Sequence, residues 1–352
     1  MGGGSTVRTN RTSKRSYWPT TEWRPGDPAD LYMDAGRLAD LERVLMSEYS
    51  NISGILVVKN GFVVYENYMN GYGPDDAHHV ASVTKSILSA LIGIAVDAGY
   101  IRSIDQQVLD FFPEYAADTA DPLKREITLR HLLTMTAPYP FEDWREPLDR
   151  MCMQPDWTRY ALDMLGQKGR VGDFKYSTAG AHLLSAILTR CTGATAREFA
   201  NERLFKPIGM KVIPDYEMSA FGFEQLFGSE VRGWVKDPNG NSTGGWGLAL
   251  TPRDMARFGF LYLNGGMWDN EPVIPASWIN ESTAMNPNHY GYFWWLREED
   301  GIFAYSAMGD GGNMICCMPD QDLVVVIASA FVMNPRDRWT LIKEHILPAL
   351  RD

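Results

Sequence analysis

The sequence has few of the residues and patterns that identify metal-binding or disulfide-rich proteins. Only four of its 352 residues are cysteine, no two of them form a CxxC pair, and two are adjacent. This spacing fits neither a zinc knuckle nor a disulfide framework. The six histidines form no HxH or HExxH pair, and no GxGxxG or P-loop sequence occurs. We therefore expect no metal ion and no other cofactor.

Basic charge and long hydrophobic runs are also scarce. The chain has 33 Lys and Arg against 44 Asp and Glu, a formal net charge of -11, so a nucleic-acid partner is not expected. The longest apolar runs, 87–96 and 323–331, are much shorter than the about 18 residues that a membrane-spanning helix needs, so we expect no membrane span. No signal peptide is visible, which predicts a cytoplasmic location. The sequence leaves the oligomeric state open.

The order of the predicted elements indicates the fold class. Hydrophobic residues make up 45% and charged residues 22%, as in a soluble globular protein. β-Branched runs before and after Asn60-Gly61 predict a hairpin, and further strands are expected near the C-terminus. A helix is expected near each end, and the middle of the chain is mostly helical in pattern. The predicted strands are 54–58, 62–65, 290–296, 302–305, 314–318 and 323–329, and the terminal helices are 37–49 and 337–350.

This order favours an α+β fold. Both chain ends are predicted to join in one antiparallel sheet flanked by the terminal helices, with a mainly helical region inserted. We predict an N-terminal extension over 1–32, a sheet domain made of 33–81 plus 286–352, and a mainly helical domain over 82–285. Within the extension, residues 17–32 are expected to form an arm laid on the folded body.

A Ser-x-x-Lys sequence opens the most apolar helix of the chain. Ser82 and Lys85 share a face of that helix because residues three apart are neighbours on it. A helix N-terminus offers free N–H groups and partial positive charge. Ser82 would therefore have donors for an oxyanion beside it, and a lysine that could take its proton. The spacing alone is weak evidence, and the plain alternative is an N-capping serine with a snorkelling lysine.

The charge of Lys85 decides whether it can act as a base. At the ordinary lysine pKa of about 10.4 it is almost always protonated at neutral pH, so a base needs a pKa roughly 3 units lower. Burial at the root of an apolar helix lowers the pKa in this way. The alternative is that Lys85 stays charged and lowers the pKa of a nearby tyrosine.

Several blocks of the sequence carry a family resemblance. They are 57–65, HVASVTKS at 79–86, ITLRHLLT at 127–134, FKYST at 174–178, 204–210 and 244–254. With these blocks in order, the chain resembles the serine β-lactamase and penicillin-binding protein superfamily from about 33 to 350. It looks more like the class C branch, with its esterase and oligomer-amidase relatives. The resemblance implies a β-lactamase/transpeptidase-like fold with the active site between the two domains.

The resemblance also implies roles for individual residues. Ser82 would be the nucleophile, and Tyr176 occupies the place of a tyrosine that acts with the lysine, here Lys85, as general base. Two backbone N–H groups hold the oxyanion in this family, and by position these would belong to Ser82 and Asp310. Taken alone, Tyr176 would be a boundary tyrosine beside a helix N-cap.

Two departures from the family pattern concern the substrate. Thr178 stands where the family often has asparagine, and Ala307-Met308-Gly309 replaces Lys-Thr-Gly or His-Thr-Gly. Relatives that bind β-lactams hold the substrate carboxylate with that cation and hydroxyl, and both are missing here. The departures argue against efficient β-lactam hydrolysis and against peptides that end in a free carboxylate.

The expected substrate pocket contains Thr178, Trp246, Met308 and Gly309. Trp246 is included because it lies among glycines in a loop, although aromatic side chains belong more often to the core. The sequence thus predicts a serine hydrolase that cleaves a small-molecule ester or neutral amide through a Ser82 acyl-enzyme. β-Lactamase and D-amino-acid peptidase activities are alternatives, as is a catalytically idle binding or sensor protein on the same fold.

Overall fold

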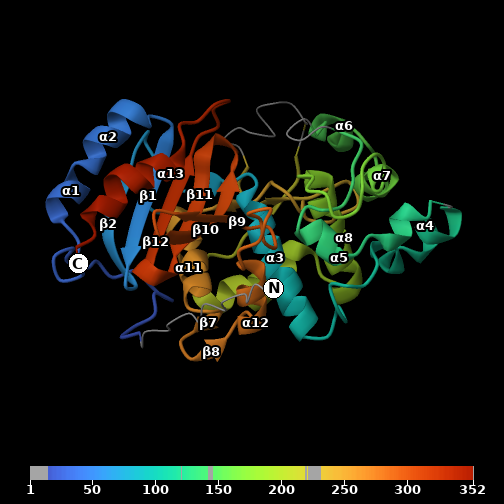
Figure 1. The fold of residues 1–352 in the computed structure, drawn as a ribbon, viewed down its shortest axis with the longest axis horizontal. Helices are drawn as coiled ribbons and strands as arrows, with labels where there is room; N and C mark the ends of the chain where they lie inside the picture. Colours follow the sequence, from blue (N-terminus) through green and yellow to red (C-terminus); the bar gives the residue numbers. More distant parts are fainter. Residues whose placement is uncertain (1–14, 120, 142–145, 219, 221–230, 352) are drawn as a thin grey trace, which may run out of the picture.

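One six-stranded antiparallel sheet organises the molecule (Figure 1). The computed structural model describes residues 15–351 except 120, 142–145, 219 and 221–230, so residues 1–14 of the predicted extension lie outside the described residues. The strand order is β2-β1-β12-β11-β10-β9. The strands are β1 (Ile52–Lys59), β2 (Phe62–Tyr68), β9 (Trp295–Glu299), β10 (Ile302–Gly309), β11 (Asn313–Met318) and β12 (Leu323–Ser329). Because β1 pairs with β12, the prediction that both chain ends share one sheet is confirmed.

The β1–β2 hairpin forms as predicted because its turn consists of residues that tolerate positive φ. Asn60 and Gly61 have φ angles of 53° and 90°, as the favoured two-residue hairpin turn requires. The strands expected over 302–305, 314–318 and 323–329 correspond to β10, β11 and β12.

The strand predicted over 290–296 is wrong for most of its length. Phe293 has a φ of 62°, and the Gly291 N–H bonds to the Trp294 carbonyl at 2.8 Å, so the chain turns before it enters β9 at Trp295. Gly291 also packs tightly, since a Cβ there would lie 1.9 Å from the Ser282 carbonyl oxygen. A turn with these close contacts cannot be seen in a run of aromatic residues.

Helices cover both faces of the sheet, so its central strands are apolar on both sides. Side chains alternate between the faces of a strand. Leu56 accordingly belongs to the core that includes α11 (Pro252–Leu263), and the next residue, Val57, to the core that includes α2 (Leu41–Glu48). Figure 1 shows α1 (Ala35–Ala39), α2 and α13 (Arg338–Leu341) on one side of the sheet, and α11 on the other.

The terminal helices differ in detail from the prediction. The helix expected over 37–49 ends after α1, where the Asp40 N–H bonds back to the Gly36 and Leu38 carbonyls, and a second helix, α2, follows. Met46, within the helix predicted over 37–49, is 68% exposed. At the C-terminus α13 passes into a π-helical turn (Ile342–Ile346) and a 3₁₀ turn (Leu347–Ala349).

The long helix α3 (Val83–Asp97) joins the sheet to the helical part of the molecule. Every residue from 83 to 95 is buried, as its apolar sequence predicts. On one side α3 contacts β10, and on the other it contacts α8 (Thr178–Thr192) and α9 (Ala196–Ala200). Its N-terminus therefore lies where the sheet and the helices meet.

The remaining described elements are short and connect these parts. They are the helices α4 (Pro113–Asp118), α5 (Leu129–Leu133), α6 (Leu148–Cys152), α7 (Trp157–Met164) and α12 (Ala276–Ser282); the two-residue strands β3 (His78–His79), β4 (Asp215–Tyr216), β5 (Trp234–Val235), β6 (Ala249–Leu250), β7 (Met267–Trp268) and β8 (Glu271–Pro272); the 3₁₀ turns η1 (Val108–Phe111), η2 (Leu123–Glu126), η4 (Lys206–Ile208), η5 (Asp310–Gly312) and η6 (Pro319–Gln321); and the π-helical turn η3 (Asn201–Phe205).

The N-terminal arm lies against the folded body. Trp18 packs against Phe260 and Trp268, and Arg15 pairs with Asp322 at 2.6 Å. The division of the chain into an extension and two domains stays a prediction. One helix of the region assigned to the helical domain, α11, packs on the sheet strands β1, β11 and β12.

Candidate active site

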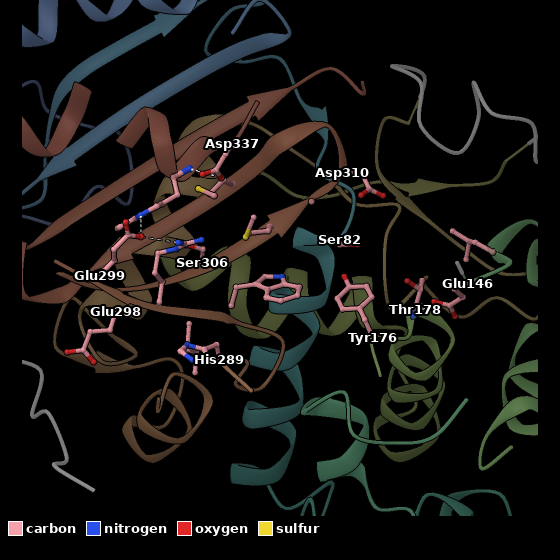
Figure 2. Close-up of a pocket in the computed structure, with 18 residues that line it drawn as sticks. Ser82, Glu146, Tyr176, Thr178, His289, Glu298, Glu299, Ser306, Asp310 and Asp337 are labelled. Atoms are coloured by element: carbon pink, nitrogen blue, oxygen red, sulfur yellow. Dashed lines mark hydrogen bonds and ion pairs between the residues drawn. The ribbon is translucent and has the colours of Figure 1, made fainter. Parts of the chain in front are cut away.

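Ser82 stands at the N-terminus of α3 and lines a cavity of about 890 Å³ (Figure 2). The residue before it, Ala81, has a φ of 47°, a left-handed conformation that is unusual for a residue with a side chain. This turn brings the chain from β3 into α3. The first-turn N–H groups of a 15-residue helix therefore lie beside the Ser82 hydroxyl.

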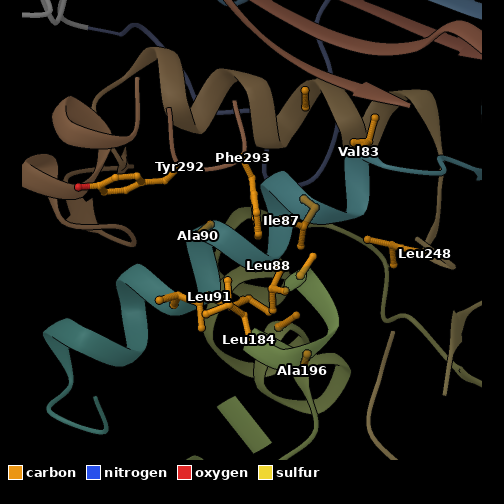
Figure 3. Packing of buried hydrophobic residues seen from close by; sticks show 14 of the residues in the cluster. Val83, Ile87, Leu88, Ala90, Leu91, Leu184, Ala196, Leu248, Tyr292 and Phe293 are labelled. Carbon is orange, nitrogen blue, oxygen red and sulfur yellow. The ribbon is translucent and has the colours of Figure 1, made fainter. Parts of the chain in front are cut away.

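The helix that carries Ser82 is held by packing on all sides (Figure 3). Ile87, Leu88 and Leu91 of α3 share one core with Leu184 of α8 and Leu248. A close-packed interior leaves little freedom for a side chain or helix to shift. Ser82 and Lys85 are therefore presented from a rigid element.

Lys85 is the most unusual residue of the site because it is buried and bonds to no carboxylate of the described residues. Its exposure is 2%, and its Nζ lies 2.9 Å from Ser82 Oγ, 3.1 Å from Thr178 Oγ1 and 2.7 Å from the Gly245 carbonyl oxygen. Burial lowers the pKa of Lys85 to about 8, while Glu146 and Asp310 act in the opposite direction. The lysine is thus brought into the range where a neutral amine exists near neutral pH.

Tyr176 reaches the same point from the start of α8. Its side chain hydrogen-bonds with Ser82, its ring centroid lies 4.9 Å from Lys85 Nζ, and it stacks on Trp295 with centroids 6.0 Å apart. Burial raises the pKa of Tyr176 above its usual value of 10. The phenol is therefore neutral at neutral pH. Because the pKa of Tyr176 is raised and not lowered, Lys85 is favoured as the base over a tyrosinate stabilised by a charged Lys85.

The end of β10 comes close to the start of α3. A Cβ on Gly309 would lie 2.2 Å from the Val80 carbonyl oxygen and 3.1 Å from the Ser82 nitrogen, so only glycine fits there. Asp310 follows directly and lines the cavity with Ser82. The arrangement allows the N–H groups of Ser82 and Asp310 to serve one oxyanion, and that role of Asp310 stays a prediction.

The loop after β10 is anchored by side chains from β11, α13 and the turn before β1. Asn313 Nδ2 donates to the Asp310 carbonyl at 2.8 Å, and the buried Arg338 donates to the carbonyls of Gly311 and Gly312 at 3.1 and 3.2 Å. Asn51 Nδ2 donates to the Gly311 carbonyl at 2.8 Å. These hydrogen bonds hold the backbone of residues 310–312 in place beside Ser82.

We expect Gly309→Ala to destabilise the fold by about 1–3 kcal/mol, the usual cost of forcing an extra carbon into a packed site. The methyl group must displace the Val80 carbonyl or the strand itself. Urea unfolding followed by fluorescence measures the loss. Gly73→Ala is the control, because its nearest neighbour to an added Cβ is 3.6 Å away. Equal midpoints for the two variants would contradict the close approach.

Three of the four predicted pocket residues line the cavity, namely Thr178, Met308 and Gly309. Trp246 does not: it is 5% exposed and stacks on Trp157 in the core, with centroids 6.1 Å apart. The glycines around Trp246 serve a different purpose. A Cβ on Gly245 would lie 2.6 Å from Thr178 Cγ2, so glycine there lets the Gly245 carbonyl reach Lys85.

Glu146 is a residue of the site that the sequence did not single out. It lines the cavity, and its carboxylate accepts hydrogen bonds from the Thr178 and Ala179 N–H groups at 2.5 and 2.6 Å. Burial raises its pKa, and these two hydrogen bonds and Lys85 oppose the rise. No motif marks Glu146, because it contacts α8 from more than 30 positions away in the chain.

The cavity continues away from Ser82 along β9 and β10 toward α13 (Figure 2). Trp295 and Met308 are also among its lining residues. The far end is acidic, with Glu298, Glu299 and Asp337 in its lining. Glu299 is engaged by Lys343 and by Trp339 Nε1, and Asp337 caps α13.

No group of three or more His, Cys, Asp or Glu side chains among the described residues is arranged to hold a metal ion. Likewise, in this part of the chain no helix has both the length and the apolar character needed to cross a bilayer. The cytoplasmic location stays a prediction.

Comparison with known proteins identifies the family. Residues 38–344 match the sequence model of the Beta-lactamase family. The chain belongs to this family. The resemblance stated from the sequence and the α+β fold of the β-lactamase/transpeptidase type are therefore confirmed.

The chain is similar in sequence to one named hydrolase and similar in fold to other named proteins. The 6-aminohexanoate-dimer hydrolase of Paenarthrobacter ureafaciens is 25% identical, over 92% of this chain and 84% of its own. The octameric penicillin-binding protein homologue of Pyrococcus abyssi superposes with a TM-score of 0.68 at 21% identity, covering 91% of this chain and 78% of its own. A D-stereospecific amidohydrolase from Streptomyces superposes with a TM-score of 0.65 at 17% identity, covering 88% and 98%.

Proposed function

We propose that this protein is a serine hydrolase that cleaves a small-molecule ester or neutral amide through an acyl-enzyme on Ser82. The observation that carries the proposal is the 2.9 Å contact between Ser82 Oγ and the buried Lys85 Nζ at the wall of the cavity. A binding or sensor protein has no need of a lysine whose pKa is lowered to about 8 beside a serine hydroxyl. The geometry therefore favours catalysis over a catalytically idle fold.

In the first step Ser82 Oγ attacks the substrate carbonyl carbon while Lys85 takes its proton. A neutral amine has two N–H donors and one lone pair. Thr178 Oγ1 and the Gly245 carbonyl accept the two N–H groups, so the lone pair points to the third neighbour, Ser82 Oγ. This arrangement supports Lys85 as the general base.

The later steps need an acid and an oxyanion site. Tyr176, a neutral phenol in contact with Ser82, can pass its proton to the departing alcohol or amine. The tyrosinate that results then takes up the proton that Lys85 received from Ser82. The N–H groups of Ser82 and Asp310 would hold the oxyanion, each contributing about 3 kcal/mol by analogy with other oxyanion holes. Water then releases the acyl group through the same residues.

The names of the relatives support an amide as well as an ester substrate. One is named for hydrolysing a 6-aminohexanoate dimer and another as an amidohydrolase. The lack of a cation and a hydroxyl at Ala307 and Met308 supports a neutral group next to the scissile bond. Ala307 is fully buried, whereas Met308 lines the cavity, so Met308 is the position that meets the substrate.

Covalent labelling tests the proposal. A fluorophosphonate is expected to add one adduct mass to the intact protein, and peptide mapping should place it on Ser82 because that hydroxyl contacts both Lys85 and Tyr176. Ser82→Ala is the matched variant and should take up no label. Ser86, one turn further along α3 and bonded to the Phe293 carbonyl, provides the control variant Ser86→Ala. Labelling that persists in Ser82→Ala would refute the assignment.

A further inference from the structure

The Gly245 carbonyl, which accepts a hydrogen bond from Lys85 Nζ at 2.7 Å, belongs to a bend over residues 243–247 between β5 and β6. Val235 holds the two ends of this bend together. The Thr243 N–H donates to the Val235 carbonyl, and the Val235 N–H donates to the Gly247 carbonyl, each at 2.8 Å. The position of the bend as a whole therefore sets the position of the Gly245 carbonyl.

The side chain of His79 ties this bend to the segment that leads into the nucleophile. His79 Nε2 lies 3.0 Å from the Gly247 nitrogen and accepts its N–H. His79 is part of β3, three residues before Ser82, and it pairs with Ala249 of β6. The strand before Ser82 is thus joined, through one imidazole, to the bend that faces Lys85.

The chemistry of this contact fixes the state of the imidazole. A backbone N–H can only donate, so His79 Nε2 must carry a lone pair and the ring proton must be on Nδ1. A protonated imidazole has donors at both nitrogens and cannot accept the Gly247 N–H. Burial lowers the pKa of His79 to about 4, so the ring is neutral at neutral pH. The contact is therefore present wherever Lys85 has a share of neutral amine.

We infer that His79 is a positioning residue for the general base Lys85, because it holds the bend whose Gly245 carbonyl accepts the lysine N–H. The inference rests on the proposed function, since it assumes that Lys85 deprotonates Ser82. With one N–H of the amine directed to Gly245, its lone pair is kept toward Ser82 Oγ, 2.9 Å away. His79 lies outside the described lining of the cavity, so the substrate itself should not contact it.

His78, the other residue of β3, separates a positioning role from a merely structural one. It is buried, its Nδ1 lies 3.0 Å from Ser53 Oγ, and burial lowers its pKa to about 4 as well. Its hydrogen bond goes to β1 and not to the bend over 243–247, as expected for neighbours that point to opposite faces of a strand. Loss of this bond should weaken the fold without moving the Gly245 carbonyl.

A pair of amide substitutions at His79 tests the inference. Glutamine can place its amide oxygen near the position of Nε2, whereas asparagine is one methylene shorter and does not reach the Gly247 N–H. For His79→Asn we expect kcat for a nitrophenyl ester to fall about tenfold with KM little changed, because the lone pair of Lys85 is misdirected while the substrate contacts remain. His79→Gln should keep most of the wild-type kcat. Equal kcat values for the two variants would overturn the inference.

The matched control is His78→Gln, in which the amide group is too long to replace Nδ1 beside Ser53. We expect a lower melting temperature than that of the wild-type protein and an unchanged kcat. If His78→Gln lowers kcat as much as His79→Asn does, the loss comes from a weakened β3 in general, and the positioning role is refuted.

These outcomes are distinct from failure of the proposed function. If the wild-type protein is labelled at Ser82 but His79→Gln and His79→Asn have the same kcat, the positioning role alone is refuted. If Ser82 takes no label in the wild-type protein, the proposed function itself is refuted, whatever the variants show.

Discussion

Lys85→Ala is expected to lower kcat/KM by about 10² or more, the usual scale for a positioned acid–base group. The reason is that Lys85 Nζ is the group 2.9 Å from Ser82 Oγ whose pKa, about 8, suits a base near neutral pH. Tyr176→Phe is expected to have an effect of similar size, because the phenol contacts the same Ser82 hydroxyl. Steady-state hydrolysis of a short nitrophenyl ester measures both.

The double variant shows whether the two residues work as a unit. Residues that handle one proton together give effects far from additive, so the double variant should be little worse than either single one. Lys124→Ala provides a control, because Lys124 is also a buried lysine but bonds to Tyr115 and the Leu162 carbonyl. If Tyr176→Phe keeps a rate near that of the wild type, Tyr176 has no acid–base role and is only a tyrosine beside the N-cap of α8.

The sign of the pH dependence follows from the charge of Lys85. At pH 7 a group with a pKa of about 8 is a free amine in about one molecule in ten, against about one in a few thousand at the ordinary lysine pKa. The rate of Ser82 acylation should therefore rise with pH and level off above about pH 8. A rate that falls as pH rises from 6 to 8 would show that a protonated Lys85 is required.

The fold was predictable from the sequence where local pattern and burial agree. β1 is apolar from Ile55 to Val58 and β12 from Leu323 to Ala328. The turn between β1 and β2 uses Asn60 and Gly61, whose positive φ the sequence signals directly. The start of α3 was recognisable because Ser82 and Lys85 stand at the beginning of a helix whose residues 83–95 are all buried. In each case the deciding contacts lie within a few residues of one another.

The residues that sequence reasoning missed depend on contacts between distant parts of the chain. Glu146 meets α8 from a separate segment, and Phe293 adopts its positive φ inside a turn packed on Ser282. One further signal lies in the sequence of β10 itself. Because side chains alternate along a strand, Ala307 and Met308 had to face opposite sides of β10, and only one of them could meet a substrate.

Substrates that carry a carboxylate next to the scissile bond are expected to be poor. Met308 lines the cavity at the position where the family pattern has a hydroxyl, and Ala307 stands at the position of the cation. A charge-assisted hydrogen bond contributes roughly 1.5–3 kcal/mol, so its loss weakens the binding of such substrates about 10 to 150-fold. Neutral esters lose nothing by this change.

The charges of the other lining residues also disfavour a substrate that carries a carboxylate. Among the described residues that line the cavity, Arg297 is the only lysine or arginine, and its Nη1 pairs with Glu299 at 3.1 Å. Glu146, Glu298, Asp310 and Asp337 add negative charge to the same wall. A carboxylate that enters the cavity therefore meets repulsion as well as the lack of a partner.

Side-by-side rates for a short nitrophenyl ester, a D-amino-acid amide and a chromogenic cephalosporin test this charge preference. We expect kcat/KM to be highest for the neutral ester, and Met308→Arg to narrow the gap to the cephalosporin by supplying a cation at the cavity wall. Met333→Arg is the matched control, since Met333 is 81% exposed and lies outside the lining. A wild-type protein that clears the cephalosporin faster than the ester would mean that Arg297 turns from Glu299 to the substrate, and the β-lactamase alternative would then replace the esterase one.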